Sequence, residues 1–138
     1  MTAQSASAAN RPLAFSLHVL PAVAYVAALF YGGLIRMGEL PELGFVPTDK
    51  LLHAAAFGGL ALLLARAVHF SSARGSLRKC LWLGALGSSV LGALLEVCQH
   101  FVPYRSSDPL DWLADTVGAV LAVCAALALL RLVQRVEG

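Results

Sequence analysis

Four long runs of apolar residues alternate with shorter polar segments along the chain. The runs cover about Leu13–Ile35, Leu51–Val68, Cys80–Phe101 and Trp112–Leu132. Each has the roughly 17 to 25 residues that an α-helix needs to cross ~30 Å of hydrocarbon at about 1.5 Å per residue. A transmembrane β-barrel would instead show segments of about ten alternating residues. The pattern therefore predicts an all-α, polytopic membrane protein with four transmembrane helices in a small antiparallel bundle.

The composition agrees with a protein that has lipid as its solvent. Of the 138 residues, 59% are hydrophobic and 13% are charged, whereas soluble domains have about 25% charged residues. The net charge of +2 comes without a clustered basic face, so we expect no nucleic-acid partner. The cysteines Cys80, Cys98 and Cys124 show no metal-ligand spacing. We expect them to be unpaired apolar fillers.

The first eleven residues differ in composition from the rest of the chain. They are mostly Ala and Ser, with Thr, Gln, Asn and a single charge at Arg11. Such a segment cannot bury enough apolar surface to order itself. We therefore expect a disordered cytoplasmic tail over residues 1–11 and a single transmembrane domain over residues 12–138.

Lysine and arginine beside the spans predict the orientation, because positively charged flanks stay in the cytoplasm. Three such residues, Arg36, Lys50 and Arg105, lie on one side of the predicted bundle. The seven others lie on the opposite side: Arg11, Arg66, Arg74, Arg78, Lys79, Arg131 and Arg135. Both termini are therefore predicted to be cytoplasmic, in the inner membrane of a bacterium. The same assignment places all acids except Glu137 in the outer half.

Polar residues concentrate where the second, third and fourth runs reach the predicted outer surface. Asp49 and His53 are one helical turn apart at the start of the second run, so they share a face. Glu96 lies about a turn inside the third run, and Asp115 lies inside the fourth. A carboxylate at this depth is costly unless it faces protein or water. We therefore expect Glu96 and Asp115 to face the interior of the bundle.

Small residues repeat on the same helix faces as these acids. In the third run the series recurs every four residues and consists of Gly84, Ser88, Gly92, Glu96 and His100. The fourth run has a similar series, which consists of Asp108, Asp111, Asp115, Gly118, Ala122 and Ala125. Small residues let helix backbones approach closely in membranes. Both series therefore predict helix–helix contacts that end in acids at the outer surface.

The topology brings these helix ends to one leaflet, so we predict a single ligand-binding polar cluster there. Its members are Asp49, Lys50, His53, Glu96, Gln99, Arg105, Asp108, Asp111 and Asp115. Lys50 and Arg105 are its expected cations, and Arg105 would give a bidentate contact to a phosphate-bearing or zwitterionic group. A purely structural role stays open for Asp108, because Asp before Pro109 is typical of a helix N-cap. We expect no resident metal and no cofactor.

Three motifs occur in a fixed order along the chain. They are Asp49-Lys50-x-x-His53, Glu96-x-x-Gln99, and Arg105 with Asp108 and Asp111-x-x-x-Asp115. This order resembles the VanZ-like family over about Asp49 to Ala122, although family members commonly carry Asn where this chain has Asp115. The family is named for a membrane protein linked to resistance to the glycopeptide teicoplanin, and many members lie outside resistance operons. The resemblance therefore implies a location and a site rather than a reaction.

Three functions remain open. The first is a non-catalytic cell-envelope factor whose outward-facing pocket binds a membrane lipid, a cell-wall precursor or an amphiphilic antibiotic. The second is a small membrane enzyme acting on a lipid-linked substrate, with His53 as the base, although no nucleophile is evident. The third is a small-molecule transporter assembled from several copies. The first span has no acid, whereas four-helix exporters carry their coupling acid there.

Overall fold

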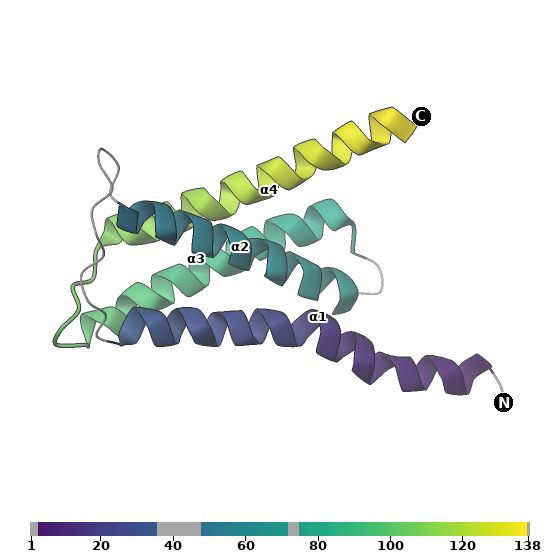
Figure 1. The fold of residues 1–138 in the computed structure, drawn as a ribbon, viewed down its shortest axis with the longest axis horizontal. Coiled ribbons are helices and arrows are strands. Elements are labelled where there is room, and N and C mark those ends of the chain that lie inside the picture. Colours follow the sequence, from purple (N-terminus) through teal and green to yellow (C-terminus); the bar gives the residue numbers. More distant parts are fainter. Residues whose placement is uncertain (1–2, 36–47, 72–74, 138) are drawn as a thin grey trace.

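The computed structural model describes residues 3–35, 48–71 and 75–137, and for residues 3–15, 48 and 137 the backbone alone. Within these ranges the chain forms four helices and no strands. They are α1 (Ala3–Leu34), α2 (Thr48–Ser71), α3 (Leu77–His100) and α4 (Pro109–Glu137). Successive helices run in opposite directions (Figure 1). The predicted all-α antiparallel bundle is confirmed.

Each helix contains a stretch that is long and apolar enough to cross a membrane. The stretches are Ser16–Leu34, Asp49–Ser71, Leu77–His100 and Pro109–Val136. Large apolar side chains cover the outside of the bundle, and Leu86, for example, is 62% exposed. Such a surface is stable in lipid, where apolar side chains meet hydrocarbon. The chain is therefore a multi-pass membrane protein, as the four apolar runs predict.

Local sequence signals determine where α3 and α4 begin. Ser76 caps α3, because its side chain accepts a hydrogen bond from the Lys79 N–H at 3.3 Å. Asp108 caps α4, with its Oδ1 2.9 Å from the Leu110 nitrogen, and Pro109 occupies the first helical position. Such caps satisfy N–H groups that have no partner inside the helix. The structural role that the sequence left open for Asp108 is therefore present.

The N-terminal segment differs from the sequence prediction. α1 begins at Ala3, so residues that we expected to be disordered have a helical backbone. The expected disorder rests on the lack of apolar surface alone. Alanine, however, is the strongest helix former, and it occupies positions 3, 6, 8 and 9. Figure 1 shows this part of α1 extending beyond the other helices. The boundary between a cytoplasmic tail and the transmembrane domain at residue 11 stays a prediction.

α2 contacts all three other helices, and glycines let two of them approach its backbone closely. A Cβ added to Gly84 of α3 would collide with the Ala61 carbonyl. One added to Gly118 of α4 would collide with the Ala54 carbonyl. The helix contacts predicted from the two series of small residues are therefore present. α4 diverges from the bundle toward its C-terminus (Figure 1), and Ala125 at the end of its series is exposed.

Two groups of apolar side chains fill the space between the helices. The first joins α2, α3 and α4, and its buried members are Ala61, Ala65, Leu81, Ala85, Ala119 and Val123. The second joins α2 and α3 through Phe57, Leu60 and Leu95, with Tyr25 and Leu29 of α1 packed against them. Small residues dominate the first group, which agrees with the close approach of the backbones there.

The two ends of the bundle differ in chemistry. The start of α1 and the end of α4 lie at one end, and α2 and α4 begin at the other, where α1 and α3 finish (Figure 1). We call the latter the polar end. Both termini therefore lie on one side, but the cytoplasmic location of that side stays a prediction. The charge count behind it rests partly on Arg11, Arg36 and Arg74, which lie outside the described side chains.

Candidate functional site

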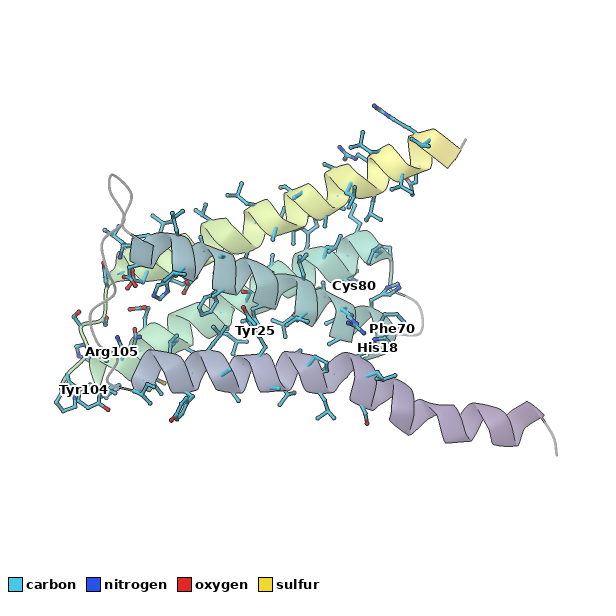
Figure 2. All side chains as sticks on the ribbon, viewed as in Figure 1. His18, Tyr25, Phe70, Cys80, Tyr104 and Arg105 are labelled. Atoms are coloured by element: carbon cyan, nitrogen blue, oxygen red, sulfur yellow. The ribbon has the colours of Figure 1, made fainter. Side chains whose placement is uncertain are left out.

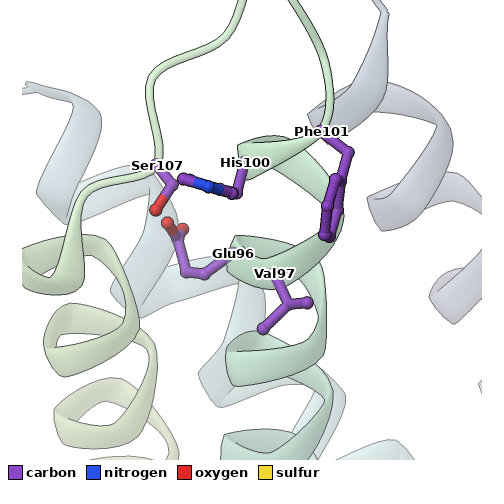
Figure 3. A pocket seen from close by; sticks show the side chains of 5 residues that line it. All are labelled: Glu96, Val97, His100, Phe101 and Ser107. Atoms are coloured by element: carbon purple, nitrogen blue, oxygen red, sulfur yellow. The ribbon is translucent and has the colours of Figure 1, made fainter.

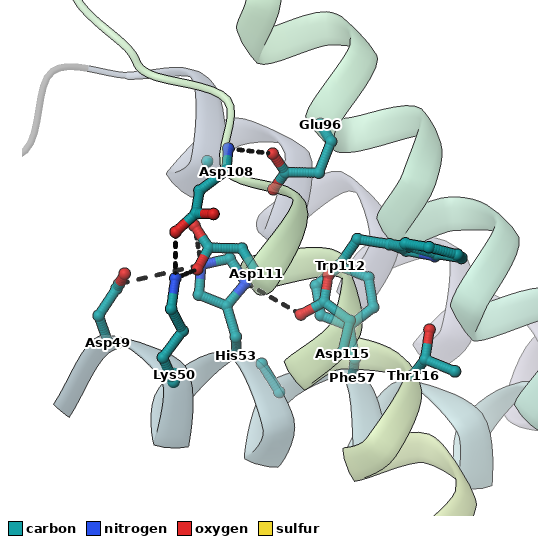
Figure 4. Close-up of polar contacts among 12 residues, drawn as sticks. Asp49, Lys50, His53, Phe57, Glu96, Asp108, Asp111, Trp112, Asp115 and Thr116 are labelled. Atoms are coloured by element: carbon teal, nitrogen blue, oxygen red, sulfur yellow. Dashed lines mark hydrogen bonds and ion pairs between the residues drawn. The ribbon is translucent and has the colours of Figure 1, made fainter. Parts of the chain in front are cut away.

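Lys50 links the starts of α2 and α4 at the polar end. Its Nζ lies 2.6 Å from Asp108 Oδ2 and also forms an ion pair with Asp111 Oδ1 (Figure 4). Asp111 is in the first turn of α4, where the helix dipole favours an anion. The hydrogen bond from Lys50 holds the pKa of Asp108 below its ordinary value. The Asp108 carboxylate is therefore ionised at neutral pH.

His53 lies about one turn further along α2 and faces three carboxylates (Figure 4). Its Nδ1 is 2.9 Å from Asp115 Oδ1, which is a hydrogen-bond distance. Its Nε2 is 3.9 Å from both Asp49 Oδ1 and Asp111 Oδ2, and this is too long for a hydrogen bond. Asp115 therefore fixes the orientation of the ring, and the second ring nitrogen is turned toward the two other acids.

Glu96 connects α3 to the same group of side chains. Its Oε2 accepts a hydrogen bond from the Asp108 backbone N–H at 2.9 Å. Contacts from α2, α3 and α4 thus form one network, which we call the acidic cluster. Its members are Asp49, Lys50, His53, Glu96, Asp108, Asp111 and Asp115. The structure therefore brings together every predicted member except Gln99 and Arg105.

Three acids of the cluster are buried: Asp115 completely, and Glu96 and Asp111 with 8% and 9% exposed. Glu96 Oε1 and Asp115 Oδ2 are buried without a hydrogen-bond partner among the described residues. The free oxygen of Asp115 packs against Gly92, where an added Cβ would lie 2.7 Å from it. Gly92, a member of the predicted α3 series, therefore makes room for a buried acid.

Gln99 and Arg105 make hydrogen bonds outside the acidic cluster, and their membership of one ligand-binding site stays a prediction. Gln99 Nε2 donates to the Gly33 carbonyl and Arg105 Nη2 to the Gly32 carbonyl, both at 3.0 Å. The last carbonyls of a helix have no partner inside it, so donors from other elements are favourable there. In these hydrogen bonds, both side chains donate to backbone carbonyls at the end of α1, and neither donates to a carboxylate of the cluster.

Tyr104 belongs to the same arrangement and was not predicted as part of the site. Its hydroxyl donates to the Leu34 carbonyl at 3.1 Å. We call Gln99, Tyr104 and Arg105 the α1 clamp, and Figure 2 shows Tyr104 and Arg105 beside the end of α1. The sequence contains no local signal for it, because the donors and the carbonyls are more than sixty residues apart.

An open pocket of about 230 Å³ lies beside Glu96 at the end of α3. Its lining residues are Glu96, Val97, His100, Phe101 and Ser107. Figure 3 shows the side chains of Glu96, His100 and Ser107 pointing toward one another. The four-residue spacing of Glu96 and His100 already places them on one face, but nothing in the sequence places Ser107 beside them.

The acidic cluster contains more carboxyl groups than basic groups. Its carboxylates are Asp49, Glu96, Asp108, Asp111 and Asp115, and its basic groups are Lys50 and His53. Because Arg105 is engaged at α1, the cluster lacks the guanidinium on which the predicted contact to phosphate depended. A concentration of one sign of charge attracts the opposite sign.

Comparison with known proteins gives the family. Residues 3–131 match the family model described as VanZ/LLP1. The chain belongs to the VanZ/LLP1 family. The match includes the acidic cluster, the α1 clamp and the pocket, and it confirms the resemblance seen in the motifs. No curated protein and no solved structure matches the chain.

The VanZ/LLP1 chain also has side chains that could hold a metal ion. Asp49, His53 and Asp111 each offer one ligand atom, and these atoms lie within 4.8 Å of one another. Metal-bound histidines usually have a carboxylate or carbonyl on the other ring nitrogen, and Asp115 occupies that position on His53. Lys50 already pairs with Asp111, so an ion would share this acid with it. The expectation of no resident metal stays a prediction.

Proposed function

We propose that this VanZ/LLP1 protein is a non-catalytic factor of the bacterial cell envelope. Its acidic cluster binds a cationic group of a membrane-associated molecule, such as a lipid, a cell-wall precursor or an amphiphilic antibiotic. The observation that carries the proposal is the network of buried acids at the polar end, in which Asp115 is fully buried. Ionisable residues at membrane depth are costly and usually serve a function.

Packing alone does not account for these acids. Further from the polar end, α2, α3 and α4 pack through alanines such as Ala61 and Ala119. Replacing buried ion pairs by well-packed apolar residues is often neutral or stabilising. An apolar interface could therefore hold the polar end together as well. The charges instead supply a field that concentrates cations at the membrane surface.

The proposal places the polar end outside the cell and both termini in the cytoplasm. Its support is the excess of Lys and Arg on the side of the termini. Arg66 lies on that side, where its Nε donates to His18 Nδ1 at 3.0 Å. The acidic cluster would then meet molecules that approach the inner membrane from outside.

We rank binding ahead of catalysis because of the surroundings of His53. Its hydrogen-bond and ion-pair partners in the described part of the chain are carboxylates. A base that activates a nucleophile needs a hydroxyl, a thiol or a bound water within hydrogen-bond reach. The carboxylates hold and orient the ring, and no hydroxyl or thiol is among its partners in the described residues.

The family resemblance extends the proposal to tolerance of teicoplanin. A strain deleted for the chain and complemented with the wild type should tolerate more teicoplanin than the deletion strain. Asp49→Asn should restore less tolerance at equal membrane levels, because it removes a half-exposed charge of the acidic cluster. Glu137→Gln removes an acid from the other end of α4 and is the matched control.

Two outcomes of this experiment contradict the proposal. Equal tolerance of the deletion strain and the complemented strain would remove the link to glycopeptides. Full restoration by Asp49→Asn would show that the charge of the acidic cluster is not used for this role.

A further inference from the structure

The pocket at the end of α3 is small and lies at membrane-surface depth. Its volume of about 230 Å³ is below the ~300–1,000 Å³ typical of sites for drug-sized ligands. It lies in the last turn of a membrane span, next to the loop that leads to α4 (Figure 3). The pocket therefore suits one polar headgroup, and a whole glycopeptide would not fit into it.

One carboxylate oxygen of Glu96, which lines this pocket, has no hydrogen-bond donor among the described residues. Its side chain is buried, and its Oε2 already accepts from the Asp108 N–H at 2.9 Å. Its Oε1 is buried and has no hydrogen-bond partner among the described residues. A buried carboxylate oxygen is unfavourable until a donor reaches it. A molecule that enters the pocket can supply this donor.

The charge beside the pocket indicates that this donor is cationic. The neighbouring acidic cluster contains more carboxylates than basic groups, and Lys50 is engaged by Asp108 and Asp111. An incoming anion would be repelled, whereas an ammonium group would satisfy Glu96 Oε1 and reduce the excess charge together.

The other walls of the pocket indicate that the cation belongs to an amphiphile. Val97 and Phe101 are 56% and 78% exposed, so exposed apolar side chains border the pocket. An acyl chain can lie along such apolar side chains at the membrane surface. His100 and Ser107 line the polar part and can bond phosphate or ester oxygens of the same headgroup.

We infer that the pocket formed by Glu96, Val97, His100, Phe101 and Ser107 binds the primary ammonium group of a membrane lipid, with an ammonium N–H donating to Glu96 Oε1. The inference rests on the proposed function and names its ligand class. A trimethylammonium headgroup has the same charge but no N–H donor. The pocket therefore distinguishes phosphatidylethanolamine from phosphatidylcholine by hydrogen bonding.

Native mass spectrometry of the full-length protein in detergent tests this inference. The protein is mixed with phosphatidylethanolamine and phosphatidylcholine that have the same acyl chains. We expect retention of the ethanolamine lipid to exceed that of the choline lipid by roughly tenfold, the effect of one charged hydrogen bond. Free ethanolamine should compete only weakly, because it lacks the acyl chains that contact Val97 and Phe101.

Variants separate the pocket from the general charge of the protein. Glu96→Gln keeps an oxygen for the Asp108 N–H but removes the carboxylate, so it should abolish the preference for ethanolamine lipid. Glu137→Gln should keep the preference. A preference that survives Glu96→Gln, or equal retention of both lipids by the wild type, would overturn the inference.

Two further outcomes would show which part of the inference is wrong. Competition by free ethanolamine as strong as that by the lipid would overturn a lipid as the ligand. If both lipids bind equally while Asp49→Asn still reduces teicoplanin tolerance, the pocket assignment alone fails and the proposed function stands.

Discussion

Asp115 illustrates what can be learned about a single residue from sequence and what requires the structure. Its depth inside α4 predicts that it faces protein, and the side chain is fully buried. The sequence predicts that Asp115 and His53 belong to one polar cluster, but the hydrogen bond between Asp115 and His53 Nδ1, at 2.9 Å, requires the structure. Spacing along one helix fixes depth and face, but it does not determine which side chain of another helix lies opposite.

Substitution of Asp115 should separate the roles of its oxygen and its charge. Asp115→Asn keeps an oxygen that can accept from His53, as the Asn common in the family would, so it should change the free energy of unfolding by less than about 1 kcal/mol. Asp115→Ala leaves His53 without its partner and should cost about 1–3 kcal/mol. Thermal unfolding in detergent measures both. Equal losses for the two variants would argue against this hydrogen bond.

At the scale of secondary-structure elements, the α1 clamp shows which contacts of Gln99 and Arg105 the sequence leaves open. The sequence gives their depth correctly, at the polar end with the acids. It gives no information on which side of the bundle the end of α1 lies, and α1 has unsatisfied carbonyls there. The carbonyls of Gly32, Gly33 and Leu34 accept these hydrogen bonds, so these donor groups are engaged at α1.

Removal of the clamp arginine should loosen α1 without disturbing the acidic cluster. Arg105→Ala removes the donor to the Gly32 carbonyl and should cost about 1.5–3 kcal/mol. Hydrogen exchange of the last turn of α1 should become faster, while exchange at the start of α4 stays unchanged. Arg78→Ala, at the exposed start of α3, is the control. Faster exchange at the start of α4 instead would place Arg105 functionally within the acidic cluster.

Close packing of α3 on α2 can be tested with two glycines of the same helix. Gly84→Ala should destabilise the bundle by about 1–3 kcal/mol, because the new Cβ meets the Ala61 and Ala65 backbone. Gly87→Ala meets only Leu64 Cδ1 at 3.2 Å, which can move. It should be neutral or gain up to about 1 kcal/mol from helix propensity. Unfolding in detergent compares them, and similar losses would contradict the close contact.

At the scale of the whole molecule, the architecture could be predicted from the sequence because a lipid bilayer restricts which segments can cross it. Spans must be long, apolar and helical, so the number and direction of the helices follow from hydropathy. The gathering of acids at one end of the bundle could also be predicted, because acidic side chains inside spans must face other protein groups instead of lipid. The sequence predicts an outward-facing pocket but not its lining residues, because these depend on how the loop containing Ser107 lies beside Glu96.

The account depends most on the acidic cluster facing the outside of the cell. Cysteine labelling of intact cells tests this directly, after Cys80, Cys98 and Cys124, which are unpaired, have been replaced by alanine. A cysteine at Ser107, beside the cluster, should react with a membrane-impermeant maleimide. A cysteine at Gly75, between α2 and α3, should react only after the cells are permeabilised. The opposite pattern would place the acidic cluster in the cytoplasm and contradict the account.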